Sequence, residues 1–390
     1  GITVFRANAA FHADETAPAT SNHIVHLVPS PDQSDILTYH KADVPEPSGP
    51  TMDLTATNIV IATGAKPRPL PGNPFAGALI DSTQALEVNE FPSSAVIIGA
   101  GAIALEFASM WNAAGSKVTL LIRKDRVLSA WDRRAGTTLT RELKRHGVNI
   151  ITRASVTHVD TGANLGATVH YTCEGQDGEQ SVWGEIALVA IGRDPITDPA
   201  WGVTIDDHEH VATDAYGRTD KPGVWAVGDV TAGHALAHRA FEQGIVIAET
   251  IAGLNPKPVD EATVPQIVFS FPEAASVGLT VEQAQAREDL IEIKETNYPM
   301  LANARMLMSG TAGSLTIVSG CDATNPDTPR VLGVHMVSQM ASDIIAEAEQ
   351  LVGNHVPLAD AARLVHPHPT FSETLGEALL KADGRPLHTR

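Results

Sequence analysis

Runs of apolar residues, separated by glycine, proline and polar turns, predict alternating strands and helices along this chain. The clearest alternation lies between residues 91 and 195. Residues 95–98 read as a buried strand, 102–114 as a helix and 117–122 as a second strand. A helix that carries Leu139 and Leu143 follows and stops at Gly147. Together with a strand at 186–191, these elements predict a self-contained α/β unit.

The flanking regions are less regular, but they also favour strands joined by loops. Short β-type runs occur at 2–5 and 23–28, and residues 59–64 read as a buried strand that ends in a glycine turn. The proline-rich stretch 66–72 cannot be helical and indicates a crossing between domains. Further elements are predicted as a strand at 224–227 and helices at about 236–251 and 373–381.

The composition of the chain argues against two classes of partner, nucleic acids and membranes. The chain has 390 residues, with 27 Lys and Arg against 46 Asp and Glu, a formal net charge of −19. This acidic balance argues against a nucleic-acid partner. We find no apolar run long enough to span a membrane and no secretory leader, which predicts a protein without a membrane partner.

The reactive residue types point away from disulfide and metal scaffolds. Cys173 and Cys321 lie far apart in sequence, which predicts a cytoplasmic protein with two structural cysteines. The 16 histidines form no clustered ligand set by spacing, so we predict no metal site.

A glycine-rich turn carries the sharpest chemical signal. Gly99 permits a tight turn, Gly101 lets the backbone approach a pyrophosphate, and Ala104 lets the following helix pack closely on the strand. The pattern predicts dinucleotide binding, the alternative being a merely tight strand–helix turn.

The end of the next strand bears on which nicotinamide nucleotide binds. An acidic residue there would bind a ribose hydroxyl, whereas this chain has Arg123 and Lys124, which suit a 2′-phosphate. NADP(H) is therefore favoured, and a solvated basic loop is the alternative.

Two other segments carry candidate polar chemistry. Asp229 ends the strand at 224–227, where it either accepts a ligand hydroxyl or caps the next helix. In His366-Pro-His368-Pro-Thr-Phe-Ser-Glu373, an imidazole beside a carboxylate suits acid–base chemistry. From spacing alone, two surface histidines before a helix cap at Ser372 are the favoured explanation of this segment.

Taken in order, these segments resemble the pyridine-nucleotide disulfide oxidoreductases, the family of dihydrolipoamide dehydrogenase, glutathione reductase and mercuric reductase. The resemblance spans essentially the whole chain. It rests on the Ala-Thr-Gly turn at 62–64, the Gly99 turn, Ile-Gly-Arg at 191–193, Val-Gly-Asp at 227–229, residues 269–278 and the His-Pro-Thr ending. The Leu-Ala-His that follows Val-Gly-Asp looks most like the dihydrolipoamide dehydrogenase branch.

The resemblance implies a role for each matching residue. His368 and Glu373 match the family's acid–base pair, which acts on thiols at the other subunit's site. The residues implied to line FAD are Thr63, Gly64, Asp229, Ala235, Leu236, Ala237 and His238. The residues implied to lie along NAD or NADP are Gly99, Gly101, Ala104, Glu106 and Gly192, with Arg123 and Lys124 at the strand end.

The implied fold is α/β, with a Rossmann-like NAD(P) domain inserted in an FAD domain and followed by an α+β dimerisation domain. The expected division is 1–89 for the first FAD segment, 90–200 for NAD(P), 201–262 for the returning FAD segment and 263–390 for the homodimer interface. The implied activity moves electrons between dihydrolipoamide on a lipoyl-bearing carrier protein and a nicotinamide nucleotide. An NADPH-dependent disulfide reductase acting on a small disulfide substrate is the alternative enzyme. A non-catalytic nucleotide-binding or oligomerisation module is the alternative from another class.

Two departures from the family pattern matter. The family's flavin fingerprint and its CxxxxC redox pair would precede Gly1, so we expect that the chain continues a longer protein. Ala104, Ala108, Ile122 and Arg123 resemble the NADPH-using glutathione reductases rather than dihydrolipoamide dehydrogenases. This leaves the nucleotide, and with it the substrate, open.

Overall fold

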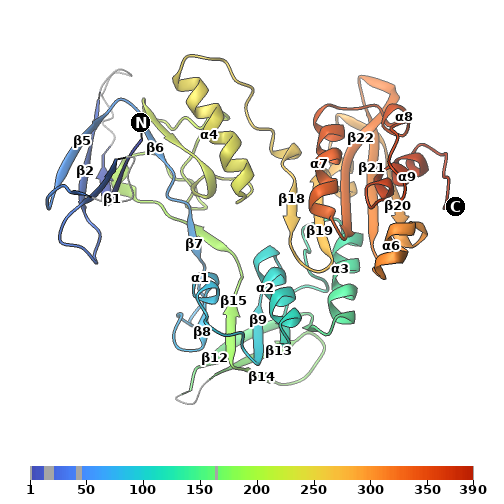
Figure 1. The fold of residues 1–390 in the computed structure, drawn as a ribbon, viewed down its shortest axis with the longest axis horizontal. Coiled ribbons are helices and arrows are strands. Elements are labelled where there is room, and N and C mark those ends of the chain that lie inside the picture. The colour runs from blue at the N-terminus through green and yellow to red at the C-terminus, as the bar shows by residue number, and fades with distance from the viewer. Residues whose placement is uncertain (1, 13–21, 41–45, 163–165, 390) are drawn as a thin grey trace. The chain divides into compact units, whose positions relative to one another are not determined.

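The computed structural model describes residues 2–12, 22–40, 46–162 and 166–389, and it divides into two compact units (Figure 1). Unit 1 comprises Gly1–Lys66 and Arg193–Glu261, and unit 2 comprises Pro67–Gly192 and Ala262–Arg390. Each unit is therefore built from two separate stretches of the chain.

The described residues of unit 1 form an antiparallel sheet, a parallel strand pair and one long helix. The sheet has the order β4-β3-β1-β2-β5. Its strands are β1 (Thr3–Phe11), β2 (His23–Pro29), β3 (Leu37–His40), β4 (Glu46–Pro47) and β5 (Met52–Ala56). The strand predicted at 2–5 is thus longer than its apolar start suggested. Outside this sheet lie β6 (Ile59–Ile61), β7 (Ala65–Pro67), β16 (Arg193–Pro195), β17 (Val224–Ala226), α4 (Ala237–Ile251) and the 3-10 turns Pro199–Trp201 and Gly228–Val230.

A small apolar core holds unit 1 together. Phe11 stacks on Trp201 at 6.0 Å between ring centroids, and both pack with Ile61, Val211 and Val224. The predicted strand at 224–227 and helix at 236–251 are confirmed as β17 and α4. The proline-rich crossing is not helical, as predicted, and it begins with the short strand β7, which pairs with β16.

A parallel sheet forms the first half of unit 2, in the order β11-β10-β9-β15-β8. Its strands are β8 (Leu79–Ile80), β9 (Ser94–Ile98), β10 (Lys117–Leu121), β11 (Asn149–Ile151) and β15 (Ile186–Val189), with helices α1 (Ser82–Leu86), α2 (Ala102–Ala113) and α3 (Arg133–Arg145). The predicted strand–helix–strand at 95–122 is confirmed. Because β8 pairs with β15, this parallel sheet begins at Leu79, before the boundary that was expected after residue 89.

An antiparallel sheet of three strands lies between β11 and β15 in sequence. It has the order β12-β13-β14, with β12 (Ala154–Asp160), β13 (Ala167–Cys173) and β14 (Gln180–Gly184). The inner face of β13 is buried at Val169 and Tyr171, while His170 lies on the outer face. The pattern of apolar and polar residues did not predict this sheet.

The second half of unit 2 is a five-stranded antiparallel sheet with helices, as the implied α+β domain requires. The strand order is β18-β19-β22-β21-β20. Its strands are β18 (Gln266–Val268), β19 (Glu273–Gly278), β20 (Leu290–Pro299), β21 (Ser314–Asp322) and β22 (Asn325–Ser338). The helices are α5 (Val281–Gln285), α6 (Ala304–Ser309), α7 (Ala341–Gly353), α8 (Leu358–Ala361) and α9 (Glu373–Ala382), with 3-10 turns at Glu261–Thr263 and Met300–Ala302.

One apolar core joins the two halves of unit 2. Val268, Ala274 and Val337 belong to the same buried cluster as Leu105 and Leu139 from the parallel-sheet half. For this reason residues 263–390 form one compact unit with Pro67–Gly192, although their sheet is separate.

The fold bears on the two predictions about the cysteines and about membrane spans. Cys173 and Cys321 are both free and buried, which confirms that they form no disulfide. Among the described residues, no helix combines the length and the apolar character that crossing a membrane would require.

Candidate functional site

The carboxyl ends of β10, β9 and β15 meet at one edge of the parallel sheet. Gly99 follows β9, and its N–H donates to the Leu121 carbonyl at 3.1 Å. Its φ of +142° suits glycine, and a Cβ there would overlap the Ala190 carbonyl. Only glycine can therefore make this turn.

The next residues of the turn leave room for a phosphate group. Gly101 is the N-cap of α2, and no described residue lies within 4 Å of a Cβ placed on it. Ala104 is fully buried and lies 3.4 Å from a Cβ placed on Gly99, so the helix packs tightly on the turn. The N-terminus of α2 therefore borders open space, which suits an anionic pyrophosphate.

The other residues predicted to bind the nicotinamide nucleotide lie in two places. Most of them lie at this edge of the sheet, and Glu106 lies beside Phe269. Arg123 and Lys124 are exposed just after β10, and Gly192, with φ +136°, follows β15 at the same edge. Glu106, by contrast, accepts a hydrogen bond from the Phe269 N–H at 3.0 Å. Glu106 thus ties α2 to the segment that leads into β19.

Unit 1 has a comparable edge, formed by the parallel pair β6 and β17. The Val227 N–H donates to the Ile61 carbonyl at 3.0 Å, so Thr63 and Asp229 follow the carboxyl ends of neighbouring strands. Thr63 donates to the Ile196 carbonyl at 2.7 Å, and Gly64 turns the chain with φ +69°. Asp229 is half-buried within the 3-10 turn Gly228–Val230.

The start of α4 completes the predicted flavin residues. Leu236 is the N-cap of α4, and Ala235, Ala237 and His238 around it are exposed. Small residues at a helix N-terminus allow close approach of an anionic group. The two alanines and the two strand ends of unit 1 therefore suit a nucleotide cofactor.

The predicted imidazole–carboxylate pair is formed in the structure. His368 Nδ1 lies 3.0 Å from Glu373 Oε1 and 3.1 Å from Oε2. The Thr370 N–H also donates to Glu373 Oε2 at 3.0 Å, which fixes the carboxylate at the start of α9. Since the His368 side chain is 67% exposed, its Nε2 edge remains open to a substrate. Ser372 is the N-cap residue of α9 but makes no side-chain cap bond.

His366 forms a second pair of the same chemical type. Its Nε2 lies 2.9 Å from Glu347 Oε1, but its side chain is only 9% exposed. The hydrogen bond with Glu347 raises the pKa of His366 despite burial. His366 is therefore held inside the unit, whereas His368 is presented outwards.

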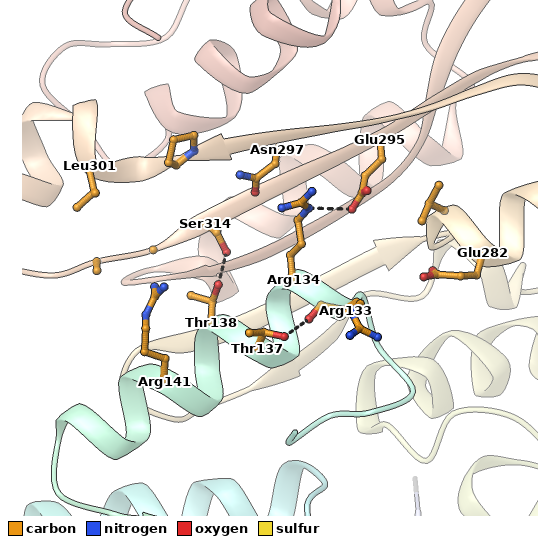
Figure 2. Close-up of a pocket in the computed structure, with 14 residues that line it drawn as sticks. Arg133, Arg134, Thr137, Thr138, Arg141, Glu282, Glu295, Asn297, Leu301 and Ser314 are labelled. Atoms are coloured by element: carbon orange, nitrogen blue, oxygen red, sulfur yellow. Dashed lines mark hydrogen bonds and ion pairs between the residues drawn. The ribbon is translucent and has the colours of Figure 1, made fainter. Parts of the chain in front are cut away.

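A pocket of about 570 Å³ lies elsewhere in unit 2, between α3 and the strands β20 and β21 (Figure 2). Arg133, Arg134 and Arg141 line one side, and Arg134 donates to Glu295 Oε1 at 3.2 Å. Its described lining contains none of the residues predicted for nucleotide binding or acid–base chemistry. The pocket is thus distinct from the candidate site.

The fold also gathers side chains that the sequence spacing did not connect. His158, His170 and Glu179 lie close enough for their ligand atoms to fall within 4.8 Å of one another. The spacing of the histidines in sequence did not predict this cluster, and the absence of a metal site stays a prediction. The missed signal was the pairing of β12 with β13, which depends on a register that short polar strands do not reveal.

Two strand edges suited to nucleotides, in separate units, are typical of an α/β oxidoreductase that uses two nucleotide cofactors. Residues 21–244 match the profile of the pyridine nucleotide-disulphide oxidoreductases, and residues 264–379 match that family's dimerisation domain. The chain belongs to the pyridine nucleotide-disulphide oxidoreductase family. Enzymes of this family use FAD and NAD(P), and the dimerisation domain supports a homodimer.

Individual relatives agree with this assignment. A dihydrolipoyl dehydrogenase of Cupriavidus necator is 37% identical over 341 residues, which cover 86% of this chain and 70% of that protein. One from Bacillus subtilis is 36% identical over 344 residues, covering 86% and 70%. Both names describe FAD-dependent disulfide oxidoreductases, the class to which this chain belongs.

Solved structures show the same fold. LpdA from Mycobacterium tuberculosis is 25% identical with a TM-score of 0.79, over 96% of this chain and 76% of that one. The HOCl-induced flavoprotein disulfide reductase RclA from Escherichia coli is 25% identical with a TM-score of 0.74, over 89% and 76%. The predicted α/β class and family are thereby confirmed.

Proposed function

We propose that this chain supplies the acid–base pair and the nucleotide-binding segments of an enzyme that oxidises a dithiol of the dihydrolipoamide type, carried on a lipoyl-bearing protein, and passes the electrons to a nicotinamide nucleotide. The observation that carries this proposal is the His368–Glu373 pair, with Nδ1 held by the carboxylate and Nε2 exposed. The dihydrolipoyl dehydrogenases among the relatives support the substrate class.

The proposed role of His368 is to move a proton. Oxidation of a dithiol to a disulfide releases two electrons and two protons, and a thiol must lose its proton before sulfur reacts. His368 Nε2 would accept that proton, while Glu373 orients the ring and stabilises the imidazolium. FAD, when bound, supplies the two-electron transfer between the dithiol and the nicotinamide.

The proposed binding residues divide between the two units. Thr63, Gly64, Asp229 and the stretch from Ala235 to His238 would hold FAD at the strand ends of unit 1. Gly99, Gly101, Ala104 and Gly192 would line the nicotinamide nucleotide in unit 2, and Glu106 on the same helix would reach it with the carboxylate oxygen that the Phe269 N–H does not occupy. We accordingly assign unit 1 to the flavin, Pro67–Gly192 to the nicotinamide nucleotide and residues 263–390 to dimerisation. We place the protein in the cytoplasm, because two free, buried cysteines suit a reducing compartment.

A second candidate is an NADPH-dependent reductase of a small disulfide. It is favoured by Arg123 and Lys124, which are exposed at the carboxyl end of β10. Two cations there suit a 2′-phosphate better than a ribose hydroxyl.

The test is a steady-state assay of the native, flavin-containing protein with dihydrolipoamide and both oxidised nucleotides. His368→Gln should lower kcat by about 10²–10⁴-fold, the usual contribution of general acid–base catalysis. Glu373→Gln should cost less, because it only orients the ring. Flavin content should remain normal in both variants.

His366→Gln is the matched control, since His366 also pairs with a glutamate but is nearly enclosed. It should retain kcat per folded molecule. If His366→Gln costs more kcat than His368→Gln, the assignment of the acid–base residue is wrong. If the unaltered protein turns over no dithiol with either nucleotide, the proposed reaction itself is wrong.

A further inference from the structure

The loop that carries His368 and Glu373 is held by a residue far from it in sequence. Asn303 is the N-cap of α6, and its side-chain Nδ2 donates to the Thr370 carbonyl at 3.2 Å. The two residues are 67 positions apart in the chain. Because Asn303 is buried, water competes little for this hydrogen bond. The start of α6 therefore fixes the loop at Thr370.

Two partners determine which way the amide of Asn303 points. Its Oδ1 accepts from the Met306 N–H at 3.0 Å, which caps α6. Since the Met306 N–H only donates and the Thr370 carbonyl only accepts, the amide oxygen faces the helix and the amide nitrogen faces the loop. An amide satisfies both partners at once, whereas an ionised aspartate would turn a second acceptor towards the Thr370 carbonyl.

Thr370 connects this contact to the imidazole–carboxylate pair. Its N–H donates to Glu373 Oε2 at 3.0 Å, and its hydroxyl donates to the Pro367 carbonyl at 2.7 Å. Glu373 Oε1 in turn lies 3.0 Å from His368 Nδ1. A single line of contacts thus runs from the Asn303 amide through Thr370 to the pair.

A second residue of α6 contacts the same loop. The guanidinium carbon of Arg305 lies 5.6 Å from the centre of the Phe371 ring, a cation–π distance. Phe371 packs against the apolar core of the antiparallel-sheet half, and Met306 of α6 is fully buried in that core. The helix is therefore anchored in the core and gives the loop a fixed support.

We propose that Asn303 is a positioning residue for the His368–Glu373 pair. Its amide fixes Thr370, and the Thr370 N–H keeps Glu373 where the carboxylate meets His368 Nδ1. The His368 ring is mostly exposed and so has little packing of its own, which makes its direction depend on Glu373. This inference rests on the acid–base role proposed above for His368.

The competing explanation is that Asn303 only caps α6. A cap needs one oxygen acceptor, which serine, threonine and aspartate supply as well as asparagine does. On that explanation the Nδ2 bond to Thr370 has no consequence for the pair. The two explanations therefore differ in the expected effect of a change at Asn303 that preserves the cap.

Asn303→Ser separates the two roles, because a serine hydroxyl can cap α6 but has no amide nitrogen for the Thr370 carbonyl. In the native, flavin-containing protein, this variant should lower kcat for dihydrolipoamide by about 10–100-fold, since a misplacement of about 1 Å can cost 10²-fold. KM should change far less than kcat, and flavin content should remain normal.

A double-mutant cycle shows whether this effect passes through Glu373. Asn303→Ser should cost clearly less kcat in a Glu373→Ala protein than in the unaltered protein. Residues that act through one network are not additive, because removing the second has little left to disturb. A purely structural loss at Asn303 would instead add to the loss at Glu373.

Thr280→Ala is the matched control for loss of stability. Thr280 is also a buried N-cap in the antiparallel-sheet half of unit 2, and it accepts from the Gln283 N–H at 3.2 Å. Its capping bonds stay within α5 and its own N-cap. Thr280→Ala should lower the thermal midpoint and leave kcat per folded molecule unchanged.

The tautomer of His368 reports the positioning without any turnover. A carboxylate only accepts, so Glu373 selects the neutral ring that carries its hydrogen on Nδ1. In protein labelled with ¹⁵N-histidine, the ring signals of His368 are those that disappear in His368→Gln. They should report the Nδ1–H tautomer in the unaltered protein and in Thr280→Ala. Asn303→Ser should shift them towards the Nε2–H tautomer.

The role assigned to Asn303 is overturned if Asn303→Ser keeps both the kcat and the tautomer of the unaltered protein. It is also overturned if Asn303→Ser lowers kcat by the same factor with and without Glu373. An unaltered protein that turns over no dithiol contradicts the proposed function instead, and the tautomer in Asn303→Ser then decides the role of Asn303.

Discussion

At the scale of single residues, a buried histidine makes the stability of unit 2 depend on pH. His335 is almost fully enclosed, and its Nε2 lies 3.0 Å from the Leu279 carbonyl. Because a carbonyl only accepts, Nε2 carries the hydrogen, and Nδ1 accepts from the Ser276 hydroxyl at 2.7 Å. Burial lowers the pKa of His335, although Asp132, Glu282 and Glu295 act in the opposite direction.

This arrangement predicts a loss of stability in mild acid. The unfolded-state pKa is about 6.5, and the folded-state pKa is lower. The contribution of neutral His335 is therefore fully present above about pH 6.5 and is lost as the pH falls through the folded value. In His335→Gln, the thermal midpoint should fall less steeply between pH 6.5 and 4.5 than in the unaltered protein. His26→Gln, at an exposed position, should leave the slope unchanged, and parallel curves for His335→Gln would contradict the prediction.

The choice of nucleotide is also decided by single residues. Arg123→Glu should weaken NADP(H) use by removing a charge-assisted contact worth about 1.5–3 kcal/mol and by adding repulsion. The ratio of kcat/KM for NADP(H) to that for NAD(H) measures this change in preference. Lys117→Glu, at the opposite end of β10, is the control and should not change that ratio. If the unaltered protein already uses NAD equally well, the basic pair at the end of β10 is merely solvated.

At the scale of secondary-structure elements, the start of α3 carries a buried cap. Asp132 Oδ1 accepts from the Ala135 N–H at 2.8 Å and from the Thr316 hydroxyl at 3.5 Å, with Asp132 only 1% exposed. One carboxylate therefore caps the helix and links it to β21.

Removing this cap should destabilise the protein. Loss of an N-cap costs about 0.5–2 kcal/mol, and we expect Asp132→Ala at the upper end because Thr316 also loses its acceptor. Asp132→Asn keeps an oxygen acceptor and should cost less. Asp81→Ala, which uncaps the five-residue helix α1, serves for comparison and should cost less than Asp132→Ala. Urea unfolding midpoints measure all three, and equal losses for the Ala and Asn variants at 132 would refute the account.

At the scale of the whole molecule, exposed apolar side chains gather in the region that matches the dimerisation domain. Val365 is 96% exposed and directly precedes the His366–His368 loop, and Leu364, Leu301, Leu307 and Met308 are exposed in the same region. Apolar side chains that a monomer leaves in water are stabilised when a second copy covers them.

We therefore expect Val365→Glu to shift the protein from dimer towards monomer. Burying a charge without a partner is costly, so the dissociation constant should rise by at least about tenfold. Sedimentation at several concentrations measures the shift. Phe91→Glu, at an apolar position 58% exposed in the nucleotide half of unit 2, should leave the dimer intact. A Val365→Glu protein that remains as dimeric as the unaltered one would place the interface elsewhere.

The sequence by itself determined the features that depend on a few neighbouring residues. The turn at Gly99, the helix α2 and the strand ends at Thr63 and Asp229 follow from patterns of a few residues, because apolar period and glycine geometry are properties of a short segment. The His368–Glu373 pair was also predictable, since five residues of chain and the start of a helix bring the two together. Six such motifs in a fixed order indicated the family before any fold was known.

Only the tertiary structure decided which distant side chains meet. Whether His158 faces His170, whether Leu79–Ile80 joins the parallel sheet and whether Glu106 binds the Phe269 N–H all depend on strand register and packing across long stretches of chain. The same holds for the difference between His366 and His368, which are two residues apart and have similar partners. Burial against Glu347 on α7 encloses one, and the edge of α9 presents the other, because exposure is a property of the packed unit and not of the segment.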